Sequence, residues 1–184
     1  MLIVAFTGSL REKSLNKGIL REVREMLPEG VEFEVLAPEE LPYYNMDLEA
    51  NEPEAVSAFK ARIRQADGAL IVTPEFNGGM PGVLKNALDW VSRPRETSPL
   101  RGKPTIITGA GAGGGTASAQ AQLRLALGRF GVNVLEQPVV HIVKAWEKFD
   151  ADGNLQDEET RANLRALVLA LIKAVEEQSA IATA

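Results

Sequence analysis

Two patterns of apolar residues follow one another in turn along this chain. One is a short continuous run of apolar residues, and the other is a longer segment in which they recur every three or four positions. The runs predict strands at Leu2–Thr7, Ala69–Val72, Pro104–Gly109 and Val132–Leu135, and the alternation with glutamates at Val31–Leu36 predicts a half-covered edge strand. The periodic segments predict helices at Leu15–Leu27, Glu54–Gln65, Val83–Val91, Ser118–Phe130 and Glu158–Glu177. Residues 37–52 and 94–102 are interpreted as loops, and the stretch after residue 135 as irregular.

Five strands that alternate with five helices indicate an α/β protein whose parallel sheet carries helices on both faces. Because crossover connections are right-handed, few topologies remain. For five strands we expect the flavodoxin-like order 2-1-3-4-5 in a three-layer αβα arrangement, with residues 1–184 forming a single domain. Such sheets bind ligands at the carboxyl edge, where the chain order reverses, here between strands one and three.

Composition narrows the classes of function. The chain has 184 residues, 45% of them apolar, so it can bury a substantial core, and its net charge of −5 argues against a nucleic-acid partner. It has no cysteine and one histidine, which excludes disulfides and a cysteine nucleophile and argues against a transition-metal site. No apolar stretch reaches the roughly 18 residues of a membrane span. The apolar start is interpreted as a strand rather than a signal peptide, so we expect a cytoplasmic protein.

The loop after the first strand has the composition of a phosphate site. Ser9, Arg11, Ser14 and Asn16 surround the start of a helix, whose first N–H groups lack intrahelical partners. A phosphate would accept those donors, and Arg11 would add a charge-assisted hydrogen bond. The alternative is a plain helix cap by Ser14 with Arg11 in solvent. The loop is not a P-loop, because the Gly-Lys-Ser/Thr ending is missing.

The loop after the third strand is unusually constrained. Pro74 and Pro81 restrict its backbone, and Phe76 and Asn77 offer a ring and a polar group. Gly78, Gly79 and Gly82 allow a flat ligand to come close, so Gly78 is a candidate cofactor-binding residue. The alternative is a rigid connection to the next helix, whose apolar residues belong to the core.

These two loops resemble those of the NADPH-dependent FMN reductase family, which includes quinone, chromate and azo-dye reductases. The resemblance rests on Gly8-Ser9-Leu10-Arg11 with Ser14 and Asn16, on Pro74-Glu75-Phe76-Asn77, and on the run from Pro81 to Trp90. It implies that Ser9, Arg11, Ser14, Leu15 and Asn16 hold the FMN phosphate, and that Pro74, Glu75, Phe76 and Asn77 contact the ribityl chain and the isoalloxazine. Family members commonly carry Tyr where Phe76 stands and an aromatic residue near Gly78, so this pocket is expected to be more open there.

The glycine tract after the fourth strand permits two interpretations. Residues 109–116 formally contain G-x-G-x-x-G between a strand and a helix, the fingerprint of a dinucleotide site. That fingerprint normally opens the first βαβ unit, whereas here it lies in the last. We therefore expect the backbone of Gly109 and Gly111 to reach the far side of a flavin ring, where N–H donors favour the reduced form.

The hypothesis is an NAD(P)H-dependent FMN oxidoreductase that transfers hydride through the flavin to a quinone, an azo dye or a similar small acceptor. The cofactor carries the chemistry, so no catalytic acid or base is assigned. The alternatives are a flavodoxin-type electron carrier and a Rossmann-type nicotinamide protein without flavin. A homodimer or homotetramer is expected, whereas neither a nucleic acid nor a membrane is expected as a partner. The sequence does not distinguish NADH from NADPH.

Three features remain outside this hypothesis. Asp150-Ala151-Asp152-Gly153-Asn154 hints at a calcium loop, but its glycine is misplaced, so a turn before the last helix is expected. His141 lies in an apolar stretch and is expected to be structural rather than a general base. Tyr43 and Tyr44 could cover the substrate or simply anchor their loop.

Overall fold

The computed structural model describes residues 1–182, and every helix and strand expected from the sequence is present with ends shifted by a few residues. The elements are β1 (Leu2–Thr7), α1 (Leu15–Met26), β2 (Glu32–Val35), α2 (Glu54–Gln65), β3 (Gly68–Val72), α3 (Gly82–Val91), β4 (Pro104–Ala110), α4 (Ala117–Gly128), β5 (Asn133–Val134), β6 (Val140–Ile142) and α5 (Glu158–Ala182). Short 3-10 segments occur at η1 (Pro38–Glu40), η2 (Met46–Asn51), η3 (Arg95–Thr97) and η4 (Ala145–Glu147).

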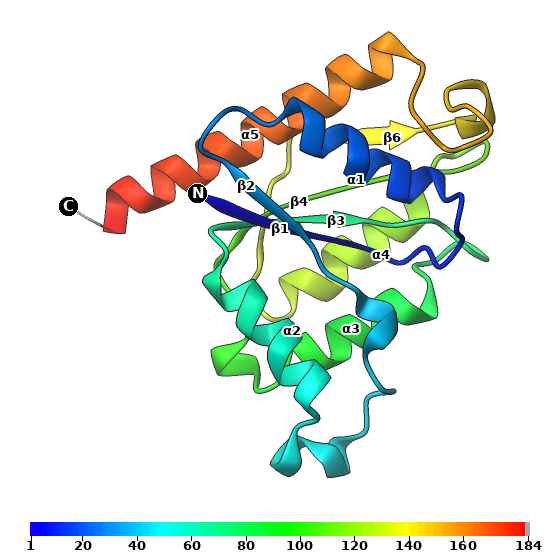
Figure 1. Cartoon of the computed structure of the whole chain (residues 1–184). Coiled ribbons are helices and arrows are strands. Elements are labelled where there is room, and N and C mark those ends of the chain that lie inside the picture. Colours follow the sequence, from blue (N-terminus) through cyan, green and yellow to red (C-terminus); the bar gives the residue numbers. More distant parts are fainter. Residues whose placement is uncertain (183–184) are drawn as a thin grey trace.

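The strands form one parallel sheet in the order β2-β1-β3-β4-β5, which confirms the expected topology (Figure 1). Ala5 of β1, for example, lies opposite Val35 of β2 and Leu70 of β3. The carboxyl ends of β1, β3 and β4 therefore lie side by side. This arrangement brings the loops that follow these three strands to one edge of the sheet.

The sheet has a sixth strand, so the expectation of an irregular stretch after residue 135 was wrong. β5 pairs only with the start of β4, at Pro104 and Thr105, whereas β6 pairs with its end, from Thr108 to Ala110. The chain leaves the sheet between them through Pro138, which has no N–H to donate to a ladder. β5 and β6 thus form the two parts of one interrupted edge of the sheet. The three residues of β6 are too few to show a periodic pattern in the sequence.

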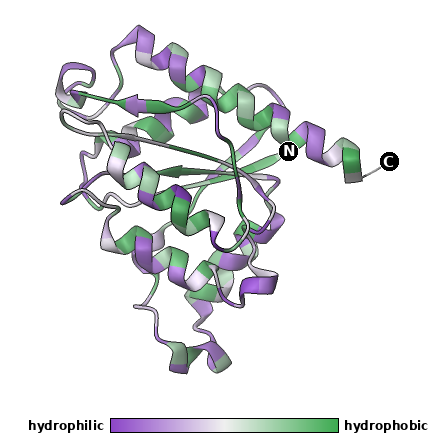
Figure 2. Cartoon of the chain, turned by 180° about the vertical axis from the view of Figure 1, so that it is seen from behind, coloured by the Kyte–Doolittle hydropathy of each residue, from purple (hydrophilic) through white to green (hydrophobic). Residues whose placement is uncertain are grey.

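Helices cover both faces of the sheet, as the alternating strand residues require. On β1, Ile3 and Ala5 belong to the core beneath α1 and α5, whereas Val4 and Phe6 belong to the core beneath α2, α3 and α4. Figure 1 shows α1 and α5 on one side and the other three helices on the opposite side. In Figure 2 the central strands are drawn mostly in green, as expected for a sheet buried on both faces. None of the helices within residues 1–182 has the length and apolar character to cross a membrane.

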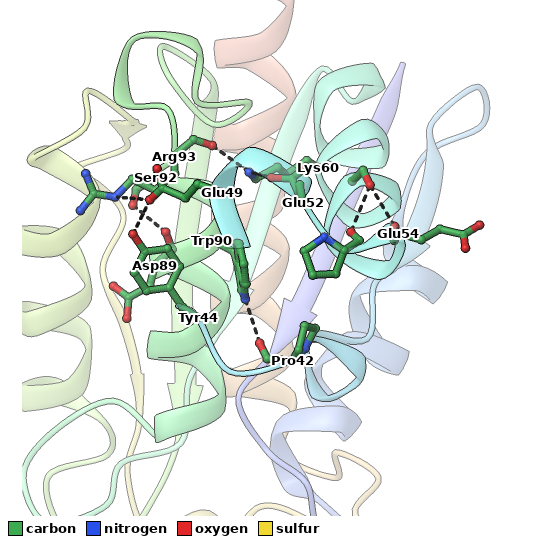
Figure 3. Close-up of polar contacts among 12 residues, drawn as sticks. Pro42, Tyr44, Glu49, Glu52, Glu54, Lys60, Asp89, Trp90, Ser92 and Arg93 are labelled. Carbon is green, nitrogen blue, oxygen red and sulfur yellow. Dashed lines mark hydrogen bonds and ion pairs between the residues drawn. The ribbon is translucent and has the colours of Figure 1, made fainter. Parts of the chain in front are cut away.

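The loop between β2 and α2 is anchored to α3 by Tyr44. The Tyr44 ring packs edge-on against Trp90 with centroids 5.1 Å apart, and its hydroxyl donates to Glu49 (Figure 3). This hydrogen bond raises the pKa of Tyr44. The Pro42 carbonyl accepts from Trp90 Nε1 at 2.8 Å. Tyr44 is therefore an anchor, whereas Tyr43 is 89% exposed.

Candidate functional site

The start of α1 offers unpaired backbone donors at the carboxyl edge of the sheet. Ser14 is the N-cap, as expected: its hydroxyl accepts from Lys17 N at 3.2 Å and donates to Ser9 Oγ at 2.6 Å. The next two N–H groups, of Leu15 and Asn16, have no partner within residues 1–182. Capping and anion binding are thus compatible here, because the cap satisfies one donor and leaves two for a ligand.

Asn16 crosslinks this loop to the glycine tract. Its side chain is buried and forms two hydrogen bonds with one residue, donating to Ala110 O at 3.1 Å and accepting from Ala110 N at 2.9 Å. The amide expected to bind a phosphate is therefore already engaged within the protein. What Asn16 presents to a ligand is its backbone N–H.

The loop after β3 is a tight two-residue hairpin. Phe76 and Gly79 exchange hydrogen bonds of 3.1 and 3.0 Å, and the residues between them, Asn77 and Gly78, have φ angles of 52° and 74°. Both left-handed positions are typical of an Asn-Gly turn between short extended segments. The sequence at 77–78 is thus explained by the backbone, and Asn77 and Gly78 do not line the cleft described below.

Glu75 caps a helix that lies far from it in sequence. Its Oε2 accepts from Ala119 N at 2.9 Å, near the start of α4, where Thr116 provides no side-chain cap. A carboxylate is favourable at a helix N-terminus because of the unpaired N–H groups there. Gln122 of the same helix accepts from Met80 N at 2.8 Å, so α4 fixes the hairpin at both ends.

Two glycines of the tract after β4 are required by close packing. A Cβ on Gly109 would lie 2.0 Å from the Thr73 carbonyl oxygen, and a Cβ on Gly111 would lie 2.1 Å from the Gly115 carbonyl oxygen. The N–H of Gly111 is donated to Ile142 O at 3.0 Å, so it is not a free donor. Among the N–H groups of the tract that the structure describes, those of Ala112, Gly113, Gly114 and Thr116 have no hydrogen-bond partner.

These loops enclose one cleft of about 300 Å³, within the range of small-molecule sites. Its lining comprises Ser9, Arg11, Ser14, Leu15, Asn16, Pro74, Glu75, Phe76, Ala110, Gly111, Ala112, Ala145 and Trp146. The structure thus brings together nine of the twelve residues predicted from the sequence. Asn77 and Gly78 lie in the turn behind Phe76, and Gly109 packs against Thr73 instead of lining the cleft.

Four lining residues were not predicted: Ala110, Ala112, Ala145 and Trp146. The two alanines of the tract lie between glycines that the sequence did indicate. Ala145 and Trp146 belong to η4, which follows the unexpected strand β6. Trp146 is 62% exposed, and its signal in the sequence was an aromatic residue within an otherwise polar stretch.

The residues of the cleft fit FMN at both ends. At one end, two unpaired N–H groups, two hydroxyls and the Arg11 guanidinium suit a phosphate. At the other end, the Phe76 ring and the backbone of Gly111 and Ala112 provide apolar surface and a free N–H, which suit a flat ring with polar edges. Among the described residues that line the cleft, Arg11 is the only basic one.

Known proteins resemble the chain over most of its length. The model of the family described as NADPH-dependent FMN reductase matches residues 1–147. A 2-hydroxy-1,4-benzoquinone reductase from Burkholderia sp. is 41% identical over 167 residues, covering 90% of this chain and 91% of that protein. An NAD(P)H-dependent FMN reductase from Pseudomonas aeruginosa is 43% identical over 186 residues, covering 92% of both.

Solved structures agree with this family. FerB, a flavoenzyme NAD(P)H:(acceptor) oxidoreductase from Paracoccus denitrificans, has a TM-score of 0.84 and 35% identity, covering 96% of this chain and 97% of that one. An archaeal flavodoxin, with a TM-score of 0.61 and 12% identity, shares the fold. The comparisons favour an enzyme over the electron-carrier and the flavin-free alternatives. The chain belongs to the NADPH-dependent FMN reductase family, and is an oxidoreductase that uses FMN with NAD(P)H.

Proposed function

We propose that FMN binds in the cleft of about 300 Å³, with its phosphate at the first turn of α1 and its ring beside Phe76 and the 111–112 backbone. The observation that carries this is the convergence, at one sheet edge, of unpaired α1 donors, the Arg11 guanidinium and the Phe76 ring. When bound, FMN would supply the redox chemistry, taking a hydride from NAD(P)H and passing two electrons to an acceptor. The chain's own residues bind and orient.

In this proposal the residues around the cleft have different roles. Ser9 and Ser14 present hydroxyls that already point toward each other, at 2.6 Å, so the phosphate end is pre-organised. The Glu75 carboxylate accepts from the start of α4, so it holds the Phe76 hairpin in place. Asn16 fixes the separation of the α1 loop and the glycine tract through its two bonds to Ala110.

We further propose that the acceptor is a quinone. Support comes from relatives named quinone reductases, among them the Burkholderia protein and a Pseudomonas putida enzyme that is 37% identical over 180 residues. The overall reaction balances as NAD(P)H, one proton and a quinone giving NAD(P)⁺ and a hydroquinone. The exposed rings of Phe76 and Trp146, which both line the cleft, offer flat apolar surface to such a molecule.

The FMN-loaded protein is expected to oxidise NAD(P)H at a rate that saturates with added benzoquinone. Loss of nicotinamide absorbance is the measurement, with an azo dye as a competing acceptor in parallel reactions. FMN binding without quinone-dependent turnover would contradict the acceptor proposal. Faster reduction of the azo dye would assign the enzyme to that substrate class instead.

Substitution of Arg11 by alanine is expected to weaken FMN binding by roughly 1.5–3 kcal/mol, because one charge-assisted contact to the phosphate is lost. Calorimetric titration of the apoprotein with FMN measures this. Lys17→Ala is the matched control. It removes an equal charge from the first turn of α1, and its side chain faces Glu39 at 4.0 Å and does not line the cleft. Equal losses in both variants would indicate a long-range charge effect and not a contact.

A homodimer or homotetramer is proposed on the same surface, because Phe76 and Trp146 are 57% and 62% exposed in the single chain. Light scattering coupled to size-exclusion chromatography tests this, with a monomeric mass at micromolar concentration as the contrary result. The single-domain organisation, the cytoplasmic location and the lack of a nucleic-acid partner stay predictions from the sequence.

A further inference from the structure

Residues 144–156 contact both walls of the cleft, and they include the segment 150–154, whose resemblance to a calcium loop fails and which is expected to be a turn. We call this segment the 144–156 brace. The family model ends at residue 147, so most of the brace lies beyond that match. It carries no group that touches a proposed ligand except Ala145 and Trp146. Its remaining contacts are with the protein, and those of residues 152–154 are with the first two turns of α1 and with Lys13.

The closest of these contacts involves two glycines. A Cβ on Gly18 would lie 1.9 Å from the Gly153 carbonyl oxygen, so the backbone of the brace touches the backbone of α1 directly. Gly153 has a φ of 79°, and a Cβ there would lie 3.3 Å from the Ser14 carbonyl oxygen. Such an approach allows only glycine at position 18. The first turn of α1, which offers its N–H groups to the cleft, therefore rests on the brace.

Arg21 ties the second turn of α1 to the same point. Its Nη2 donates to Gly153 O at 3.0 Å, to Asn154 Oδ1 at 3.2 Å and to Asp152 O at 3.3 Å. Lys13, just before the N-cap, pairs with the Asp152 carboxylate at 2.8 Å. The brace thus contacts the chain on both sides of Ser14, at Lys13 and at Arg21. The Ser14 hydroxyl donates to Ser9 Oγ in the loop after β1.

The brace has internal bonds that give it a fixed shape. The Asp150 carboxylate accepts from the backbone of Asp152 and Asn154 at 2.9 and 2.8 Å, and from the side chains of Asn154 and Gln156 at 3.1 and 3.2 Å. These bonds, first of all that from the Asn154 backbone, hold the pKa of Asp150 below its ordinary value. A loop closed by four donors on one carboxylate does not deform easily when α1 presses on it.

The other end of the brace pairs with the opposite wall. Lys144 N donates to Ala112 O and Ala145 N donates to Gly111 O, both at 3.0 Å. Lys144 adopts a left-handed φ of 47°, which turns the chain from β6 into this pairing. The brace therefore spans from the glycine tract to α1 and sets the position of one wall against the other.

We propose that the 144–156 brace holds the first turn of α1 where it binds the FMN phosphate, with Arg21 and Gly18 as positioning residues. The inference rests on the proposed FMN site, because it assigns these residues a role through the N–H groups of Leu15 and Asn16. Neither Gly18 nor Arg21 lines the cleft. Their effect on the cofactor is indirect, and it is specific to the phosphate end.

The test compares two ligands that differ only in the phosphate. Dissociation constants of FMN and riboflavin are measured by flavin fluorescence quenching for the wild type, Arg21→Ala and Arg21→Lys, at a temperature where circular dichroism finds each variant folded. Arg21→Ala is expected to weaken FMN about tenfold, with riboflavin unchanged within twofold. Arg21→Lys, which keeps a cationic donor near the same carbonyls, is expected to recover part of the loss.

Arg24→Ala is the matched control. Arg24 lies on the same helix one turn further, stacks over the Phe33 ring at 5.6 Å and does not contact the brace. Removing it changes the net charge equally, so the ratio of riboflavin to FMN dissociation constants should stay at the wild-type value. Gly18→Ala, if folded, should lower that ratio at least as far as Arg21→Ala, since its Cβ displaces the brace.

Two outcomes would overturn the positioning role of the brace, and a third would overturn the proposed phosphate site. If Arg21→Ala binds FMN like the wild type, or loses both flavins equally, the brace does not position the phosphate site. If Arg24→Ala lowers the ratio as much as Arg21→Ala, the effect is one of charge, and the positioning role fails. If the wild type binds riboflavin as tightly as FMN and Arg11→Ala changes nothing, the proposed phosphate site itself fails, a pattern separate from the first two.

Discussion

Gly109→Ala is expected to destabilise the protein by more than about 3 kcal/mol, the upper range for overpacking a tight core. The new Cβ would lie 2.0 Å from the Thr73 carbonyl oxygen and 2.4 Å from Thr116 Oγ1. The first of these is backbone of the loop that follows β3, so no rotamer change relieves the contact. Either the end of β4 or the start of the cleft hairpin must move. Urea unfolding followed by far-ultraviolet circular dichroism measures the loss.

Gly113→Ala is the control for that prediction. It lies in the same tract and keeps a φ that other residues adopt, and an added Cβ there meets nothing within 4 Å. Its stability should stay within about 0.5 kcal/mol of the wild type. If the two substitutions changed the free energy of unfolding equally, the close contact at Gly109 would not be the cause of the lost stability.

Glu52→Ala is expected to cost about 3–5 kcal/mol, because it leaves a buried cation without its counter-charge. The Lys60 side chain is 4% exposed and pairs with Glu52, donates to the Arg93 carbonyl at 2.8 Å and lies 6.0 Å from the Trp90 ring centroid (Figure 3). This pair joins the 42–52 loop to α2 and to the end of α3. Chemical unfolding followed by tryptophan emission measures the effect, in a Trp146→Phe background so that the signal comes from Trp90 alone.

A second substitution separates the buried charge from the lost contact. Glu52→Ala combined with Lys60→Met replaces the cation by an apolar chain of similar length, so most of the stability should return. Asp89→Ala, which breaks the exposed Lys85 pair on α3, should cost no more than about 0.5 kcal/mol. If the double variant is as unstable as Glu52→Ala, the loop depends on the ion pair itself.

Much of the fold could be predicted from local patterns. Buried parallel strands are continuous apolar runs, and the helices that cover them repeat with a period of 3.6 residues, so β1, β3 and β4 were located closely. β6 was missed because three residues interrupted by an exposed His141 carry no periodic signal. His141, expected to be structural, lies exposed in the middle of this strand.

The candidate site could be predicted as a set of loops but not as a set of contacts. Ser14 and Arg11 carry their roles in their residue types and in their place before a helix. Glu75 and Asn16 do not: the first caps α4 at Ala119 and the second pairs with Ala110, 94 residues away. Trp146 reaches the cleft because β6 returns the chain to the end of β4.

The sequence by itself determined the alternation of strands and helices, the strand order and the two loops at the ligand edge. These follow from hydrophobic periodicity, capping and chain connectivity, which act over a few residues. The tertiary structure alone decided which N–H groups remain unpaired, that Gly109 is a packing residue, and that residues 144–156 support α1. Those outcomes depend on which groups, distant in sequence, come within contact distance when the helices pack on both faces of the sheet. No local sequence pattern specifies these contacts.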